Sequence, residues 1–104
     1  MLQASQERNL YSIGVDTNQN ALAPGHVTCS DIKDIGKSII TVFKTIKDGT
    51  YVPGQVINAG LASGAIDVVF EDNGGIVPQP IIDKVNETRQ KIISGDLKVE
   101  IYVP

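Results

Sequence analysis

The sequence predicts an α/β fold in which helices pack against a partly parallel sheet. Two amphipathic helical patterns, at residues 31–47 and 81–93, alternate with runs rich in β-branched residues. A chain of 104 residues, 41% of them hydrophobic, is long enough for one small packed domain and too short for two. The expected order of elements is therefore two strands, a helix, one or two strands, a second helix and a final strand.

The N-terminal part contains two predicted strands joined by a loop. Residues 1–9 are mostly polar, which is typical of the end of a helix or a frayed start. The β-prone run at residues 10–15 stops at Asp16 and predicts a buried strand. A Pro-Gly pair marks residues 21–25 as a loop, and residues 26–29 are expected to form a second, very short strand.

Residues 31–47 carry the clearest helical pattern. Its apolar positions recur at spacings of three and four: Ile32, Ile35, Ile39, Val42, Phe43 and Ile46. Ser30 is the expected N-cap, and Gly49 the left-handed stop. This places Lys33 in the first turn, where the helix dipole disfavours a cation by roughly 0.3–1 kcal/mol. Either Asp31 and Asp34 compensate this charge locally, or Lys33 faces a polar group in a cleft.

The C-terminal half predicts β-structure, a helix and a last strand. Residues 55–70 form two β-prone halves broken at Gly60 and Gly64, which indicates a kinked strand or two strands. Residues 72–75 form a turn, and two prolines lead into a helix that ends at Gly95 and pairs Glu87 with Lys91. Apolar and polar residues then alternate over 97–103, the period of a half-exposed strand.

Composition excludes several classes of protein. A net charge of −3 without a basic run argues against nucleic acid as a partner. One cysteine and one histidine supply neither an internal disulfide nor a four-ligand zinc site, and we expect no cofactor. The chain has no apolar stretch of membrane-spanning length and no signal-peptide pattern, so as written it is expected to be soluble and untargeted.

Catalytic signatures are weak. His26 has neither an acid nor a nucleophile at a telling spacing, and we interpret it as a loop residue. Cys29 precedes the predicted helix N-terminus, where a thiolate would be stabilised, although a free cysteine more often acts as a small buried hydrophobe. Glycines at 60, 64, 74 and 75 do not have the spacing of a dinucleotide-binding loop. We therefore expect a protein that is not an enzyme.

Asp16 and Lys33 are the candidate ligand-binding residues. Asp16 ends a strand at the carboxyl edge of a predicted parallel sheet, which is where open α/β sheets place ligand groups. A carboxylate there can accept two hydroxyl hydrogen bonds. The hypothesis is that Asp16 and Lys33 point into one cleft and hold a polar ligand.

Several stretches in a fixed order resemble the basic membrane protein family of solute-binding lipoproteins, the purine-nucleoside receptors of ABC transporters. They are residues 13–16 (IGVD), 19–24, 28–33 (TCSDIK), 46–49, 60–66 and 91–99. Members of the family resemble type I periplasmic binding proteins, in which two α/β lobes joined by three crossover segments close on a ligand. The match covers nearly all of this chain and only the last third of such a protein.

The resemblance implies a partial type I periplasmic-binding-protein-like fold, a parallel-sheet segment with two main helices that straddles the hinge between two lobes. Residues 1–104 would be a single C-terminal segment, with the helix at 31–47 in the opposite lobe from Asp16. Asp16 would match the carboxylate that grips the ribose hydroxyls, and Lys33 the lysine near the ligand. The residues that sandwich the base lie upstream of this segment. Asp31 and Ile32 replace the family's usual apolar pair before the lysine.

The resemblance also implies partners and a location. These are a small-molecule ligand, a purine nucleoside, and an ABC transporter permease in the full-length parent, which would be extracytoplasmic as a membrane-anchored lipoprotein or periplasmic protein. Uncovered strand edges and helix faces predict a homo-oligomer or swapped dimer for the segment alone. One alternative is a ligand-sensing or dimerising α/β regulatory fragment without a transport role. Another, weaker one is an α/β enzyme with Cys29 as nucleophile.

Overall fold

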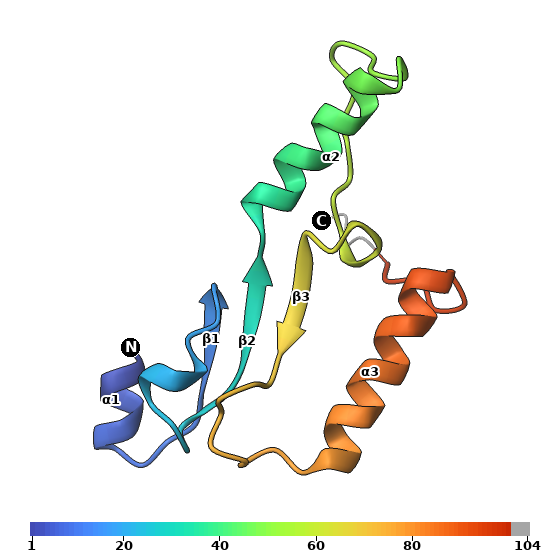
Figure 1. The fold of residues 1–104 in the computed structure, drawn as a ribbon. Helices are drawn as coiled ribbons and strands as arrows, with labels where there is room; N and C mark the ends of the chain where they lie inside the picture. The colour runs from blue at the N-terminus through green and yellow to red at the C-terminus, as the bar shows by residue number, and fades with distance from the viewer. Residues whose placement is uncertain (101–104) are drawn as a thin grey trace.

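The computed structural model describes residues 1–100 and contains three strands and three α-helices. Along the chain these are α1 (Leu2–Glu7), β1 (Ser12–Asp16), β2 (Val27–Lys33), α2 (Ile35–Lys47), β3 (Ile66–Val69) and α3 (Gln79–Ser94). Short 3₁₀ turns, η1 (Asn20–Leu22) and η2 (Leu61–Ser63), interrupt the connections. Figure 1 shows the three strands side by side, α3 beyond β3, and α2 projecting away from the end of the sheet.

The sheet has the order β1-β2-β3. β1 and β2 are parallel, with Gly14 opposite Ser30 and Asp16 opposite Ile32. β2 and β3 are antiparallel, with Lys33 opposite Ile66. The predicted α/β class with parallel strands is therefore confirmed for the β1–β2 pair, and the third strand makes the sheet mixed.

The predicted boundary between the second strand and the first long helix is wrong by several residues. β2 continues to Lys33, and α2 begins at Ile35 with Asp34 as its N-cap, whose Oδ1 accepts from the Lys37 N–H at 2.8 Å. Residues 31 and 32 pair with β1 on one side and with β3 on the other, and these two ladders override the helical spacing of the isoleucines. Ser30 is not a cap, because its side chain lies buried within the sheet.

The first strand forms as predicted, but it is not buried. It runs from residue 12 to residue 16, and Gly14 is its one buried residue. Ile13 and Val15 remain 53% and 46% exposed, because the elements packed against β1 are β2 and the short α1. Neither long helix lies over β1 (Figure 1).

The C-terminal half confirms the helix and corrects the strands. Residues 55–70, predicted as one kinked strand or two strands, contain only the short strand β3, and Gly64 follows η2 with a left-handed φ of 69°. α3 begins after Pro78 and ends at Gly95, whose φ is 85°, as the proline and glycine positions predicted. Residues 97–100 form no strand. The rest of that predicted strand, 101–103, lies outside the described residues.

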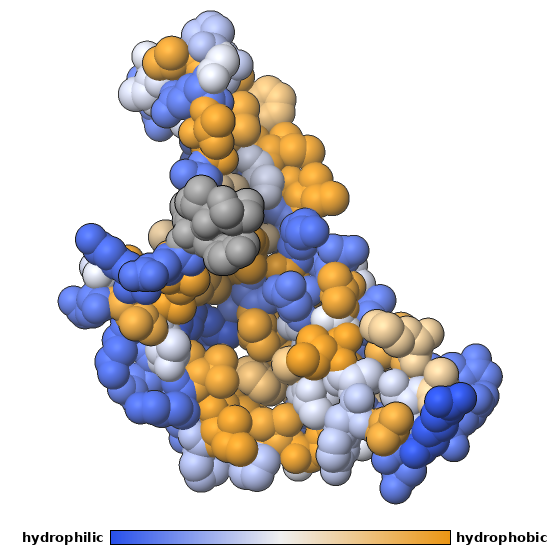
Figure 2. Space-filling model, turned by 180° about the vertical axis from the view of Figure 1, so that it is seen from behind, coloured by the Kyte–Doolittle hydropathy of each residue, from blue (hydrophilic) through white to orange (hydrophobic). Residues whose placement is uncertain are grey.

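The core is small, and α2 contributes little to it. Ala23, Val27 and Ala65 are its buried apolar residues. The amphipathic pattern of α2 is confirmed, but five of its apolar residues are more than half exposed: Ile35, Ile39, Ile40, Phe43 and Ile46. Figure 2 shows apolar surface along this projecting helix, called here the α2 arm. Among the described residues, no helix has the length and hydropathy needed to cross a membrane.

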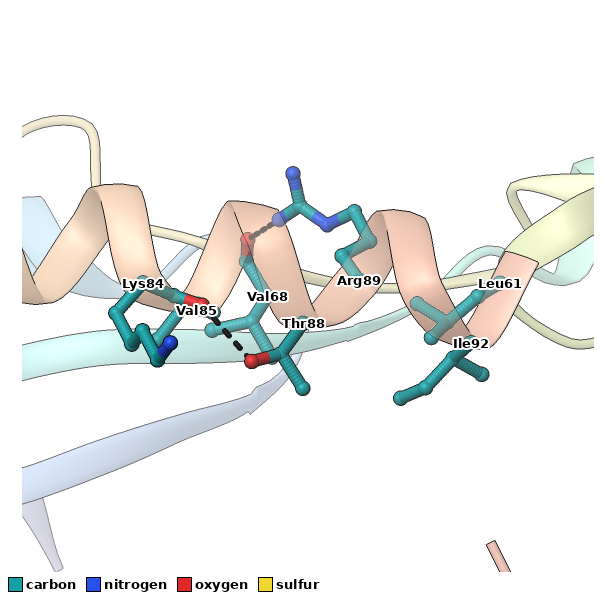
Figure 3. A pocket seen from close by; sticks show the side chains of 7 residues that line it. All are labelled: Leu61, Val68, Lys84, Val85, Thr88, Arg89 and Ile92. Carbon is teal, nitrogen blue, oxygen red and sulfur yellow. Dashed lines mark hydrogen bonds between the residues drawn. The ribbon is translucent and has the colours of Figure 1, made fainter. Parts of the chain in front are cut away.

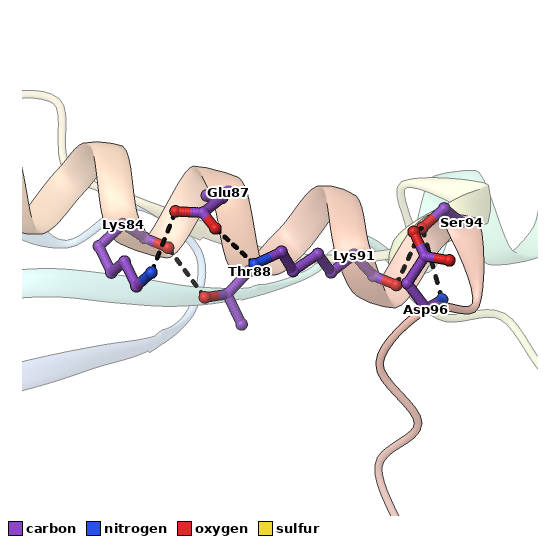
Figure 4. A network of polar contacts seen from close by, with 6 residues as sticks. All are labelled: Lys84, Glu87, Thr88, Lys91, Ser94 and Asp96. Carbon is purple, nitrogen blue, oxygen red and sulfur yellow. Dashed lines mark hydrogen bonds and ion pairs between the residues drawn. The ribbon is translucent and has the colours of Figure 1, made fainter.

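Charged residues along α3 form a local network (Figure 4). The predicted pair of Glu87 and Lys91 is present, and Lys84 Nζ lies 3.1 Å from the other carboxylate oxygen of Glu87. Hydrogen bonds from Lys91 and Lys84 hold the pKa of Glu87 below its ordinary value. The network stabilises α3 through neighbours one turn away along the same helix.

Candidate functional site

Asp16 and Lys33 meet at the carboxyl ends of two parallel strands. Asp16 ends β1, Lys33 ends β2, and the distance from Lys33 Nζ to Asp16 Oδ1 is 3.6 Å. The side chains are 66% and 65% exposed, so solvent screens the pair and it contributes no more than about 1 kcal/mol to stability. A ligand can therefore take over the hydrogen-bonding capacity of both groups at little cost.

A cleft of about 730 Å³ opens beside this pair. It is lined by Asp16, Thr17, Asn18, Ile32, Lys33, Asp34 and Ile35. Its volume lies within the roughly 300–1,000 Å³ typical of small-molecule sites. The sequence analysis did not single out Thr17 and Asn18, and it named Asp34 only as a local partner of Lys33. Thr17 and Asn18 could have been found from their position directly after the strand-ending carboxylate.

Lys33 reaches the cleft for a different reason from the one predicted. It is the last residue of β2 rather than part of the first turn of a helix, so the helix dipole gives no reason for it to need a partner. Asp34 does not compensate it, because its carboxylate lies 3.7 Å from Lys37. Of the two readings of Lys33, the structure supports the one that brings it to Asp16. That the two residues bind a ligand stays a prediction.

The backbone at Asp16 has an unusual conformation. Its φ is 72°, in the left-handed region that costs a residue with a side chain roughly 1 kcal/mol. Rotation about the N–Cα bond turns the carboxylate and the following chain away from the course of an extended strand. The turn leaves the carboxylate beside Lys33 at the mouth of the cleft.

His26 and Cys29 have no catalytic surroundings. His26 Nδ1 lies 3.3 Å from the Leu10 carbonyl. Cys29 is half-buried within β2 and not at a helix N-terminus, and its polar neighbour is the Thr28 hydroxyl at 3.8 Å. The enzyme alternative therefore loses the geometry on which it rested. Within residues 1–100, no group of three or more His, Cys, Asp or Glu side chains could hold a metal ion.

A second, smaller cavity of about 250 Å³ lies between α3 and the β3–η2 segment (Figure 3). Its walls are mainly aliphatic, with Leu61, Val68, Val85 and Ile92 beside Lys84, Thr88 and Arg89. Arg89 donates to the Val68 carbonyl at 2.6 Å and pairs with Asp67 at 2.7 Å, so its charge is already engaged. The groove therefore fits a structural junction between helix and sheet. The cleft at Asp16 is the better candidate for a polar ligand, because Asp16, Lys33 and Asp34 line it.

Comparison with known proteins shows the family of this chain. The family model described as "ABC transporter substrate-binding protein PnrA-like" matches residues 1–101. The chain belongs to this family. The predicted resemblance to basic membrane proteins is thereby confirmed.

Similar curated proteins include members from Borreliella and from Listeria. Basic membrane protein C of Borreliella burgdorferi is 34% identical over 90 residues, a match that covers 86% of this chain and 25% of that protein. The CD4+ T-cell-stimulating antigen of Listeria monocytogenes is 31% identical over 104 residues, covering 88% of this chain and 28% of that protein. The chain thus spans about a quarter of the length of these family members.

Solved structures confirm the predicted fold class. A transcriptional activator of the comK gene from Bacillus halodurans superimposes with a TM-score of 0.78 at 15% identity, covering 95% of this chain and 34% of that one. A solute-binding protein of an ABC transporter system from Aeropyrum pernix gives a TM-score of 0.64 at 21% identity, with 94% and 35% covered. The chain therefore has the architecture of about one third of such a protein.

Proposed function

We propose that this chain forms one wall of a small-molecule cleft in an ABC transporter substrate-binding protein, and that its ligand is a purine nucleoside. The observation that carries the proposal is the meeting of Asp16 and Lys33 at the carboxyl ends of parallel strands, beside a cleft of about 730 Å³. Asp16 accepts hydrogen bonds from the two ribose hydroxyls, and Lys33 donates a further polar contact. No bond is made or broken.

Residues 1–104 are, in this proposal, the C-terminal segment of a two-lobed protein. The exposed apolar face of the α2 arm supports this, since a face with five large apolar side chains more than half exposed is normally covered. The chain spans about a quarter of its curated relatives, which leaves ample sequence for the other lobe. α2 belongs to that lobe, and the chain returns through residues 48–65 to β3.

The further partners and the location follow from the family. The partner of the full-length protein is the permease of an ABC transporter. The protein works outside the cytoplasm, as an anchored lipoprotein or a periplasmic protein. The regulatory alternative is not proposed, because a likeness to a transcriptional activator at 15% identity concerns the fold alone.

The proposal is tested by ligand-dependent stability. Thermal unfolding is measured with adenosine, guanosine, inosine, pyrimidine nucleosides, nucleotides and free ribose. A ligand at 100 times its dissociation constant adds about 2.7 kcal/mol of stability. We expect purine nucleosides to raise the unfolding temperature, Asp16→Asn to abolish the shift, and Asp31→Asn to retain it. Asp31 is the matched control because it is exposed on β2 and does not line the cleft.

A chimera extends the test to a complete cleft. This chain replaces the matching segment of Basic membrane protein C of Borreliella burgdorferi, and the same nucleosides are titrated by calorimetry. Binding that is lost with Asp16→Asn supports the proposal. No response to any nucleoside in either protein, or an equal response from Asp16→Asn, contradicts it.

A further inference from the structure

A continuous set of hydrogen bonds links the loop after Asp16 to all three strands. The Gln19 side-chain Oε1 accepts from the Val15 N–H of β1 at 3.2 Å, and the Gln19 N–H donates to Ser30 Oγ of β2 at 3.0 Å. The Ser30 hydroxyl donates to Asn20 Oδ1 at 2.7 Å. Asn20 Nδ2 then donates to the carbonyls of Val69 and Glu71, at the end of β3, at 3.2 and 2.7 Å. We call Gln19, Asn20 and Ser30 the polar clamp.

Two members of the polar clamp are completely buried. Asn20 and Ser30 are both 0% exposed, and within the described residues every buried side-chain nitrogen or oxygen has a partner. Polar groups removed from water cost free energy unless every hydrogen bond is made, and a satisfied network then holds one geometry. The clamp is therefore a rigid connection between the loop and the sheet.

One hydrogen bond of the polar clamp joins residues on either side of Asp16 in the sequence. The bond from Val15 N–H to Gln19 Oε1 ties together the two ends of a five-residue segment, 15–19, that contains Asp16 with its left-handed φ of 72°. Gly14, the residue before this segment, leaves the space that Ser30 fills. A Cβ added at Gly14 would lie 2.2 Å from Ser30 Oγ and 3.0 Å from Gln19 Cβ.

We propose that Gln19, Ser30 and Asn20 are positioning residues that hold Asp16 in its left-handed conformation and so keep its carboxylate in the cleft before ligand arrives. The identity of that ligand rests on the proposed function. None of the three residues lines the cleft, so they act through Asp16 and not by touching the ligand. A carboxylate fixed in advance loses less conformational freedom when it accepts two ribose hydroxyls.

The first experiment measures the conformation of Asp16 without any ligand. A positive φ brings the amide hydrogen and Hα of one residue close together, so ¹⁵N-edited NMR gives a strong NOE between them. We expect this NOE at Asp16 in the unmodified chain, and its weakening in Gln19→Met, which keeps the length of the side chain and removes the acceptor for the Val15 N–H. Gln19→Glu restores an acceptor oxygen and should restore the NOE.

Gln19 is the primary target because it is only half-buried, so that its variants are expected to fold. Gln90→Met is the matched control, since Gln90 is exposed on α3 far along the chain from the clamp. Ser30→Ala provides the second test, with Ser12→Ala as its control at the opposite end of β1, where the hydroxyl donates to the His26 carbonyl at 3.3 Å. Unfolding in denaturant is measured for each variant.

Nucleoside affinity is then compared in the same proteins. Loss of one positioning hydrogen bond should weaken binding by roughly three- to tenfold in Gln19→Met, with recovery in Gln19→Glu and no change in Gln90→Met. An unchanged Asp16 NOE in both Gln19→Met and Ser30→Ala overturns the proposal, whatever the stability of the variants. If the NOE changes while no nucleoside stabilises any protein, the positioning role is supported and the proposed function fails.

Discussion

Residues 12–33 and the α2 arm differ in how their side chains are packed. In residues 12–33, a short loop and two strands share buried polar contacts, and Asn20 and Ser30 have no exposed surface. In the α2 arm, the side chains of Ile35 and Phe43 are 67% and 63% exposed. The buried polar groups of the first region find their hydrogen-bond partners within this chain, whereas the second region presents an apolar face that only another folded surface can cover.

The difference implies that the position of Asp16 and the strength of ligand binding depend on different parts of the protein. The position of Asp16 depends on contacts made inside the chain, so one wall of the cleft is in place before anything else binds. The α2 arm draws its helical order from its own cap at Asp34 and from bonds along the helix. A covering lobe would add the apolar burial that the arm lacks and the second wall of the cleft.

Among the substitutions proposed as tests, Gly14→Ala is expected to destabilise residues 12–33 the most. The new Cβ would lie 2.2 Å from Ser30 Oγ inside a buried hydrogen-bonded network, so β1 or the loop must move. We expect the free energy of unfolding to fall by roughly 3 kcal/mol, as measured in urea. Gly60→Ala is the control, because Gly60 has nothing within 4 Å of an added Cβ and a negative φ. Equal stability of the two variants would contradict the packing described for residues 12–33.

A second polar junction tests whether the comparison extends to α3. Arg89 donates to the Val68 carbonyl and to Asn86 Oδ1 at 2.8 Å, and it pairs with Asp67, so it ties α3 to β3. Arg89→Ala should lower the free energy of unfolding by roughly 1–2 kcal/mol, since it also leaves Asp67 without its cation. Arg8→Ala, at an exposed position after α1, should change it by less than about 0.5 kcal/mol. If Arg89→Ala and Arg8→Ala change the free energy of unfolding by the same amount, the junction between α3 and β3 contributes no stability.

Local signals predicted the elements whose ends are marked by single residues. The end of β1 at Asp16 follows from its short apolar run, and α3 lies between Pro78 and Gly95 as expected. The boundary of β2 and α2 could not be predicted from periodicity, because it is set by pairing of residues 31–33 with β3, more than 30 positions further along the chain.

The sequence predicted part of the candidate site, and it predicted one of the two residues for the wrong reason. Asp16 was placed correctly at a carboxyl strand end, while Lys33 was assigned to the wrong element and reaches the same cleft from β2. The polar clamp could not be predicted from the sequence, because the carbonyls that accept hydrogen bonds from Asn20 lie 49 and 51 residues further along the chain. Hydrogen bonds over such separations follow from strand register and not from the spacing of residue types.

The α2 arm is tested by a change that should barely affect the isolated chain. Phe43→Ser removes an aromatic side chain that is 63% exposed. We expect the free energy of unfolding to change by less than about 1 kcal/mol, compared with about 3–5 kcal/mol for truncation of a buried phenylalanine. At high protein concentration, the apparent mass of Phe43→Ser in size-exclusion chromatography with light scattering should be lower than that of the unmodified chain. The reason is that the apolar face of the α2 arm drives self-association. Thr50→Ser, beyond the end of α2, serves as control.

A stability loss of several kcal/mol in Phe43→Ser would mean that the arm is packed in this chain, and the contrast with residues 12–33 would fail. An unchanged mass distribution would remove the second copy as an occupant of the face. The covering lobe would then be the remaining candidate. The same substitution in the chimera with Basic membrane protein C should cost several-fold more stability than in the chain alone.

The smallest effect is expected at Glu87 on α3, where stabilisation comes from charges and not from buried contacts. Lys91 and Lys84 lower the pKa of Glu87 from 4.5, so folding favours its ionised form. Its contribution is therefore complete above the unfolded-state pKa and is lost as the pH falls through the lower folded-state value. The unfolding temperatures of the unmodified chain and Glu87→Gln should differ slightly at pH 7 and converge as the pH falls through the folded-state pKa of Glu87, with the gap closing in high salt. Glu71→Gln is the control for the loss of a surface charge, because it removes an exposed carboxylate without an ion pair among the described residues. A gap that persists in strong acid would mean that Glu87 acts through packing, and α3 would then resemble residues 12–33 more than the α2 arm.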